Sequence, residues 1–128
     1  MRKKRPDIKN ADSLLEASRR TMGFTLKLEV SEESADTIIR NVHEAFRMLG
    51  EALLLKRGRF AVDHTQPIEA LIGTNVQTGR PLSVLTAVRK TRNSINYYGY
   101  RPSVAEAKDA VSIAEACFEE LAEHVSNL

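Results

Sequence analysis

Apolar residues recur along this chain at steps of three and four, the spacing that puts them on one face of an α-helix. The clearest stretch is 31–56, where a broad apolar stripe faces away from a polar side and Gly58 follows the end of the pattern. A second stretch, 104–128, alternates steps of three and four like the packing seam of paired helices. The pattern therefore predicts two long amphipathic helices.

Capping residues set the expected boundaries in the first half of the chain. Ser13, followed three residues later by Glu16, predicts a helix from Ser13 to about Leu26. The stretch 25–30 taken alone is compatible with a short strand. Ser31 is expected to cap the long second helix, since a serine side chain accepts a hydrogen bond from the first helical turn.

Glycine and proline set the boundaries in the second half. A third helix is expected to begin near 63–65 and end at Gly73, and a fourth to run from Pro81 to Gly99. A capping box at Ser103 should open the last helix. With short connections, these elements predict an all-α, antiparallel bundle of four to five helices.

The composition is that of one globular domain. The 128 residues are 42% hydrophobic and 28% charged, and no apolar run approaches the roughly 20 residues that cross a bilayer. We expect a basic N-terminal tail over 1–10 and a single domain over 11–128. Cys117 cannot pair within the chain, which suggests a buried thiol in the reducing cytoplasm.

No metal or cofactor is expected from the pattern of ligating residues. His43 stands at the margin of the polar side of the second helix with no second histidine at ligand spacing, so we expect a solvated side chain. His64 is expected to cap or pack beside the third helix. No phosphate-binding glycine loop or catalytic triad is present.

Charge is distributed unevenly along the chain. Residues 1–10 hold five basic residues against one acid, and residues 55–101 hold eight against two. Residues 104–128 instead hold six acids against one lysine. Faces of opposite sign are expected, the basic one suited to phosphate, while the basic N-terminal run is interpreted as a solvated tail rather than a nucleic-acid arm.

One arginine interrupts the apolar stripe of the fourth helix. At 100° per residue, Arg92 falls in the middle of that stripe, and Arg89, Asn93 and Asn96 flank it. A core-facing guanidinium is costly unless it is paired or the seam is open. Either Arg92 forms an ion pair across the bundle or a dimer interface, or it lines a cleft that binds phosphate bidentately.

The three tyrosines of the chain follow within about one helical turn, at Tyr97, Tyr98 and Tyr100. Tyrosines beside arginines suit stacking and hydroxyl contacts with a nucleotide or RNA. The alternative is that their rings cover the end of the core.

The segment Arg92-Asn93-Ser94-Ile95-Asn96-Tyr97-Tyr98-Gly99-Tyr100, followed by a capped acidic helix, resembles the HEPN domain superfamily. The likeness covers helix order and length over residues 11–126. It implies a short helical bundle, commonly dimeric and often paired with a minimal nucleotidyltransferase in toxin–antitoxin modules. In related pairs that enzyme modifies a tyrosine near this motif, which suggests Tyr100 or a neighbour as acceptor.

In ribonuclease members of that family, four to six residues separate the arginine from a histidine. Here Tyr97 and Tyr98 follow instead, and tyrosine, with a pKa near 10, is a poor base at neutral pH. The resemblance therefore implies phosphate binding by Arg92 and Asn93 without implying cleavage.

Three functional hypotheses remain open. The first is a nucleotide- or RNA-binding HEPN-like homodimer, partner to a nucleotidyltransferase, with phosphate held by the arginines and asparagines. The second is a metal-independent endoribonuclease in which Tyr97 or Tyr98 replaces the histidine. The third is a non-catalytic interaction module. The residues that the first two require are Arg89, Arg92, Asn93, Asn96, Tyr97, Tyr98 and Tyr100.

Overall fold

The computed structural model describes residues 2–3, 5–63 and 65–128. In these ranges five helices form: α1 (Ile8–Thr25), α2 (Ala35–Lys56), α3 (Gln66–Ile72), α4 (Val84–Tyr98) and α5 (Val104–Ser126). The all-helical expectation is confirmed. The sequence pattern did not predict the two-stranded antiparallel ribbon of β1 (Arg2–Lys3) and β2 (Arg59–Phe60).

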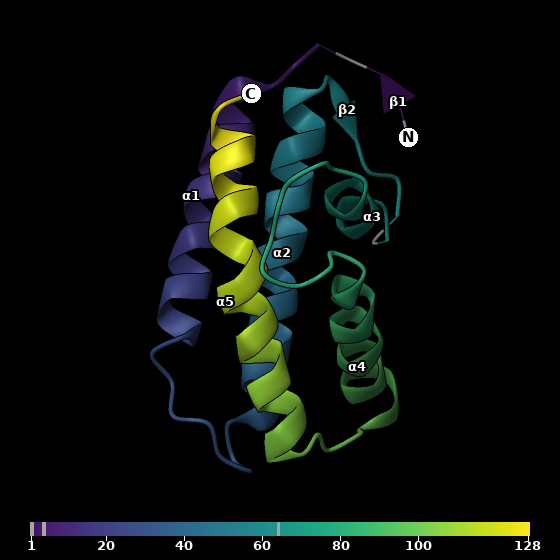
Figure 1. The fold of residues 1–128 in the computed structure, drawn as a ribbon. Helices are drawn as coiled ribbons and strands as arrows, with labels where there is room; N and C mark the ends of the chain where they lie inside the picture. Colours follow the sequence, from purple (N-terminus) through teal and green to yellow (C-terminus); the bar gives the residue numbers. More distant parts are fainter. Residues whose placement is uncertain (1, 4, 64) are drawn as a thin grey trace.

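Helix α2 is the centre of the fold because it contacts each of the other helices. Figure 1 shows α1, α2 and α5 side by side, with α3 and α4 following one another along a further side of α2. Because neighbours surround α2, most of its circumference is buried, and Ile38, Val42, Leu49 and Leu53 are fully enclosed. The ring of Phe46 meets that of Phe118 on α5 edge to face at 5.6 Å.

Gly50 allows α3 to approach α2 closely. A Cβ atom at this position would lie 2.1 Å from the carbonyl oxygen of Pro67, so any other residue would push α3 away. The backbone of Gly99 has φ +65°, the left-handed conformation that glycine adopts without a steric penalty. As predicted, Gly99 ends α4, and Ser103 with Glu106 forms a capping box at α5.

Two predicted helix starts in the first half of the chain were wrong. Helix α1 begins before Ser13, because Asp7 accepts the capping hydrogen bond from the Asn10 N–H and Ala11 already packs in the core. Helix α2 begins after Ser31, because Ser31 and Ser34 hydrogen-bond each other in the preceding turn. These serines are good capping residues, but packing and local turns moved the boundaries.

The predicted start of the fourth helix at Pro81 was also wrong, because α4 begins at Val84. The carbonyl of Pro81 accepts a hydrogen bond from the Val84 N–H in a turn that precedes the helix. The stretch 25–30 forms turns and irregular backbone rather than a strand. Asp63 starts α3 by accepting hydrogen bonds from the N–H groups of Thr65 and Gln66. The prediction for His64 lies outside the described residues.

Within the described ranges, no helix combines the length and apolar character needed to cross a membrane. Cys117 is a buried free thiol, as expected, and its burial raises the pKa of the thiol.

A candidate anion site between α2 and α4

Helices α2 and α4 pack in opposite directions and meet along a line of polar side chains. Toward one end of the line, the Arg40 Nε donates to Asn96 Oδ1 at 2.8 Å. About one helical turn farther along, the guanidinium of Arg92 meets the imidazole of His43. The predicted position of Arg92 on the packing face of its helix therefore agrees with the structure.

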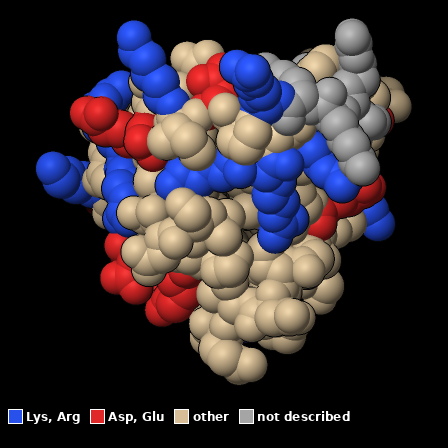
Figure 2. Space-filling view, turned by 90° about the horizontal axis from the view of Figure 1, so that it is seen from above, with Lys and Arg blue, Asp and Glu red and all other residues tan. Residues whose placement is uncertain are grey.

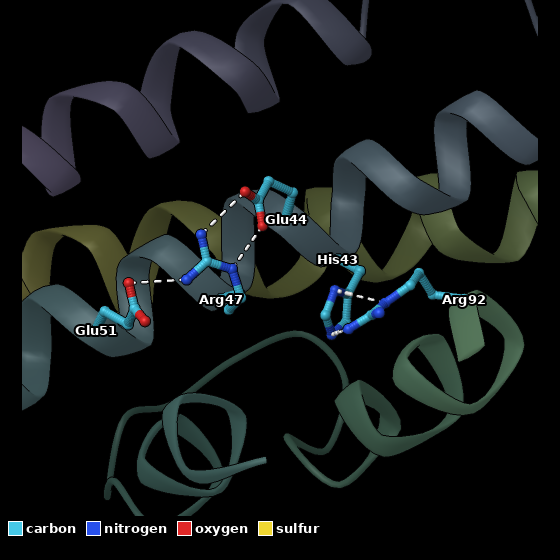
Figure 3. A network of polar contacts seen from close by, with 5 residues as sticks. All are labelled: His43, Glu44, Arg47, Glu51 and Arg92. Atoms are coloured by element: carbon cyan, nitrogen blue, oxygen red, sulfur yellow. Dashed lines mark hydrogen bonds and ion pairs between the residues drawn. The ribbon is translucent and has the colours of Figure 1, made fainter. Parts of the chain in front are cut away.

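Both ring nitrogens of His43 lie against the Arg92 guanidinium, as Figure 3 shows. The Arg92 Nε–H donates to Nδ1 over 3.3 Å, and Nη2 is 3.5 Å from Nε2. His43 is only 3% exposed, so the expectation of a solvated side chain was wrong. The reason is that α4 covers the margin of the polar side of α2, where His43 stands.

His43 is held in its neutral form. Burial, and next the positive charge of Arg92, lower the pKa of His43 from 6.5 to about 4, with smaller contributions from Arg47 and Arg89 in the same direction. The carboxylate of Glu44 acts in the opposite direction, but its effect is smaller. At neutral pH, His43 therefore accepts a hydrogen bond from Arg92 without adding a positive charge.

A second arginine of α4 has an unsatisfied group. The Nη1 atom of Arg89 is buried and has no hydrogen-bond partner among the described residues. Burying a guanidinium N–H without an acceptor is costly, because the hydrogen bonds it made to water are lost. The charge of Arg89 also lowers the pKa of His43, and Arg89 precedes Arg92 by about one turn of α4.

Arg47, on α2 next to this group, is paired by contrast. Its Nε and Nη2 donate to the two oxygens of Glu44 at 2.6 and 2.9 Å, and Nη1 is 2.8 Å from Glu51 (Figure 3). Among the described residues, no carboxylate lies within ion-pairing distance of Arg89 or Arg92. We call His43, Arg89 and Arg92 the Arg92 cluster.

The other predicted site residues surround this cluster unequally. Asn93 is half-buried on α4, and Asn96 is exposed and bonded to Arg40. Tyr97 and Tyr98 are 67% and 85% exposed, so their rings do not cover the end of the core. Five and six residues after Arg92, they project about 120–140° away from it around the helix axis.

Tyr100 is engaged elsewhere. Its hydroxyl donates to Glu106 Oε1 at 2.6 Å, which raises the pKa of the tyrosine and lowers that of the carboxyl. The structure therefore brings Arg89 and Arg92 together with His43, but does not bring the tyrosines to them.

A different face of α4 borders a groove of about 280 Å³ against α2 and α5. Its lining is largely apolar, and its charged members are the carboxylates Glu106 and Asp109. Asp109 pairs with Arg80 at 2.8 Å. A groove with this lining is unsuited to an anion, so the Arg92 cluster is the better candidate for phosphate.

Among the described residues, no cluster of three or more histidine, cysteine or acidic side chains is arranged to hold a metal ion. No family model, curated protein or solved structure matches the chain.

Proposed function

We propose that this chain is a nucleotide- or RNA-binding helical bundle in which Arg92 and Arg89 hold a phosphate group. The observation that carries the proposal is the missing counter-charge. Arg92 faces a neutral imidazole, and a buried N–H of Arg89 has no acceptor. An anion between the two guanidinium groups would supply both the charge and the hydrogen-bond acceptors.

The asparagines are suited to a supporting role. Because the Oδ1 atom of Asn96 accepts from Arg40, its amide NH₂ group remains oriented as a donor. Asn93 is half-buried on the same helix and one residue from Arg92. Amide donors and guanidinium groups together favour a phosphate oxygen over a neutral ligand.

The resemblance to the HEPN superfamily supports the rest of this proposal. It suggests a cytoplasmic homodimer that works with a minimal nucleotidyltransferase in a toxin–antitoxin type module. Of the three tyrosines, Tyr98 is the most exposed, whereas the hydroxyl of Tyr100 is occupied by Glu106. We therefore place the acceptor for a transferred nucleotide at Tyr98 ahead of Tyr100.

A binding titration tests the phosphate site. Adenosine monophosphate is titrated into the wild type, Arg92→Gln and Arg89→Gln by calorimetry, with Arg20→Gln as the control. Arg20 is an exposed arginine paired with Glu16 on α1. Loss of a charged hydrogen-bond donor should weaken binding by roughly 10- to 100-fold in the α4 variants. Equal affinity in all four proteins, or no binding by the wild type, would refute the site.

His43 favours a second candidate, a metal-independent endoribonuclease. If a bound phosphate draws the Arg92 guanidinium away, the acceptor nitrogen of the neutral His43 ring, Nδ1, becomes free to take a proton from a ribose hydroxyl. This role fits His43 better than Tyr97 or Tyr98, which point away from Arg92. The negative charge of a bound phosphate would also raise the low pKa of His43 toward the useful range.

Cleavage is tested on a denaturing gel, with mixed RNA incubated in chelator. His43→Gln and Arg92→Gln should both abolish any cleavage, while Tyr97→Phe and Tyr98→Phe should retain it. If the RNA stays intact with the wild-type protein, the endoribonuclease hypothesis is refuted and the binding function is unaffected. Loss of cleavage only in the tyrosine variants would return the catalytic role to those residues.

A further inference from the structure

The strand pairing of β1 with β2 gathers basic residues at one end of the molecule. It sets the backbone of Arg2 and Lys3 beside Phe60 and Arg59, immediately after the last turn of α2. The predicted N-terminal tail is therefore anchored in the fold at residues 2–3. Figure 2 shows lysine and arginine side chains spread over this end.

Four described side chains make up what we call the basic end: Arg5, Lys9 and Arg57, all exposed, and Arg59, which is half-buried. Arg57 and Arg59 line a hollow with Leu54 and Ala70. Neither arginine has a carboxylate at ion-pairing distance among the described residues. Their charge is therefore available to a ligand.

Acidic groups beside the basic end offset part of this charge (Figure 2). Asp7 accepts hydrogen bonds from the backbone and side chain of Asn10 at the start of α1. Asp12 lies 3.6 Å from the ammonium of Lys56, which is itself buried against the end of α5. Because Arg57 and Arg59 have no carboxylate at ion-pairing distance among the described residues, their charge forms an electrostatic footprint for a polyanion.

The basic end and the Arg92 cluster are separate regions of the same molecule. Arg57 caps the C-terminal end of α2 and follows His43 by fourteen residues, which is nearly four helical turns and about 21 Å along the axis. Whole turns put both residues on the same side of α2. Helix α3 packs on this side at Gly50, so a ligand that reaches both regions must extend past α3.

We propose that the basic end is a second contact for the backbone of single-stranded RNA, and that the ligand of the Arg92 cluster is therefore a polynucleotide rather than a free nucleotide. A single nucleotide is too short to span about 21 Å, whereas roughly six stacked nucleotides cover it at about 3.4 Å each. This inference rests on the proposed function for the Arg92 half of the path. The cations of the basic end contact phosphate groups and do not recognise the base sequence of the RNA.

The test compares two double variants that lose the same charge. Arg57→Gln with Arg59→Gln removes cations from the basic end. Arg20→Gln with Lys27→Gln is the matched control, since both residues are exposed and lie along or beyond the far half of α1. Fluorescence anisotropy measures the affinity for a labelled single-stranded RNA at several salt concentrations. The RNA has about 20 nucleotides, which is longer than the usual binding-site size for single-stranded RNA.

The basic-end variant should bind this RNA roughly tenfold more weakly than the control variant. The slope of log K against log salt should fall by about 1.4, since each lost phosphate contact removes about 0.7 for a single strand. Affinity for adenosine monophosphate should stay unchanged, because that ligand reaches only the Arg92 cluster.

Two results would overturn the inference. One is equal RNA affinity in the two double variants. The other is a defect of the basic-end variant that appears only with anionic lipid vesicles, which would assign this end to a membrane surface. If instead RNA binding depends on the basic end but not on Arg92, the proposed phosphate site fails while the basic end stands.

Discussion

Arg47 and Arg92 lie in the same polar region, but their charges are balanced in different ways. Arg47 is neutralised within its own helix, by a two-pronged contact with Glu44 and a third bond to Glu51. Arg92 reaches across to another helix and meets a neutral histidine. The residues around Arg47 in the sequence supply its counter-ions, whereas no carboxylate of the described residues lies at ion-pairing distance from Arg92.

The contrast separates an arginine that supports the fold from one that is available to a ligand. Ion pairs three and four residues apart on one helix form as soon as the helix does, so Arg47 requires nothing from outside. Holding Arg92 and Arg89 half-buried without an anion reduces stability. A cost of this kind, concentrated at one place, is typical of sites that bind.

The largest expected effect concerns the pH dependence of stability. The pKa of His43 is about 4 in the folded protein and 6.5 in the unfolded chain, so the unfolded chain binds the proton first as pH falls. The stabilisation is complete above pH 6.5 and is lost toward pH 4. Between pH 7 and pH 5, the free energy of unfolding should fall by about 2 kcal/mol through this group.

Urea unfolding of the wild type and His43→Gln at these two pH values measures this loss. The glutamine variant does not titrate, so its stability should change less over the same interval. The carboxyls with lowered pKa, including Glu44 and Glu106, lose their stabilisation at lower pH and do not interfere. The same pH dependence in both proteins would show that His43 is protonated normally.

A smaller effect on the free energy of unfolding should distinguish Arg47 from Arg92. Arg47→Gln leaves Glu44 and Glu51 without their cation, and should lower the free energy of unfolding by about 1.5 kcal/mol. Arg92→Gln should lower it by less than about 0.5 kcal/mol, because no anion loses its partner. Thermal unfolding checks both, and a larger loss for Arg92 would mark it as the structural residue.

Arg89→Met should have an effect of opposite sign on stability. Methionine has a similar length but no buried N–H in need of an acceptor, so the free energy of unfolding should stay equal or rise by up to about 1 kcal/mol. Calorimetry should show weaker binding of adenosine monophosphate by the same variant. A destabilised protein with normal binding would contradict the assignment of Arg89 to the site.

The smallest effects are expected at the exposed tyrosines. Tyr97→Phe and Tyr98→Phe remove only hydroxyl groups that face solvent, so stability should change by less than about 0.5 kcal/mol. Nucleotide affinity should be unaltered, since neither ring lies toward Arg92. A marked loss of affinity in either variant would extend the site around the end of α4.

The sequence predicted the helices better than their starts, and the arginine better than its partner. Arg92 was located by its spacing, because an arginine within an apolar stripe is conspicuous. The pattern did not predict the burial of His43, because one apolar stripe indicates a helix with one buried side, whereas four helices surround α2. A signal was present: His43 is in register with Ile39, Phe46 and Gly50, which are small or apolar residues suited to a packed face.

Other features had no local signal. The pairing of β1 with β2 joins residues more than fifty positions apart, and a strand of two residues has no periodicity to detect. The unsatisfied Nη1 of Arg89 depends on how neighbouring helices enclose it, which spacing along one helix does not reveal. Long-range packing decides both.

Lys56 should affect how often the last turn of α5 opens. Its ammonium donates to the carbonyls of Val125 and Ser126 at 2.8 and 3.2 Å, although its side chain is only 4% exposed. Terminal turns of helices usually fray, so their amide hydrogens exchange quickly with solvent. A buried cation bound to the last carbonyls opposes that opening. The final turn of α5 should therefore exchange its amide hydrogens as slowly as a turn inside the helix.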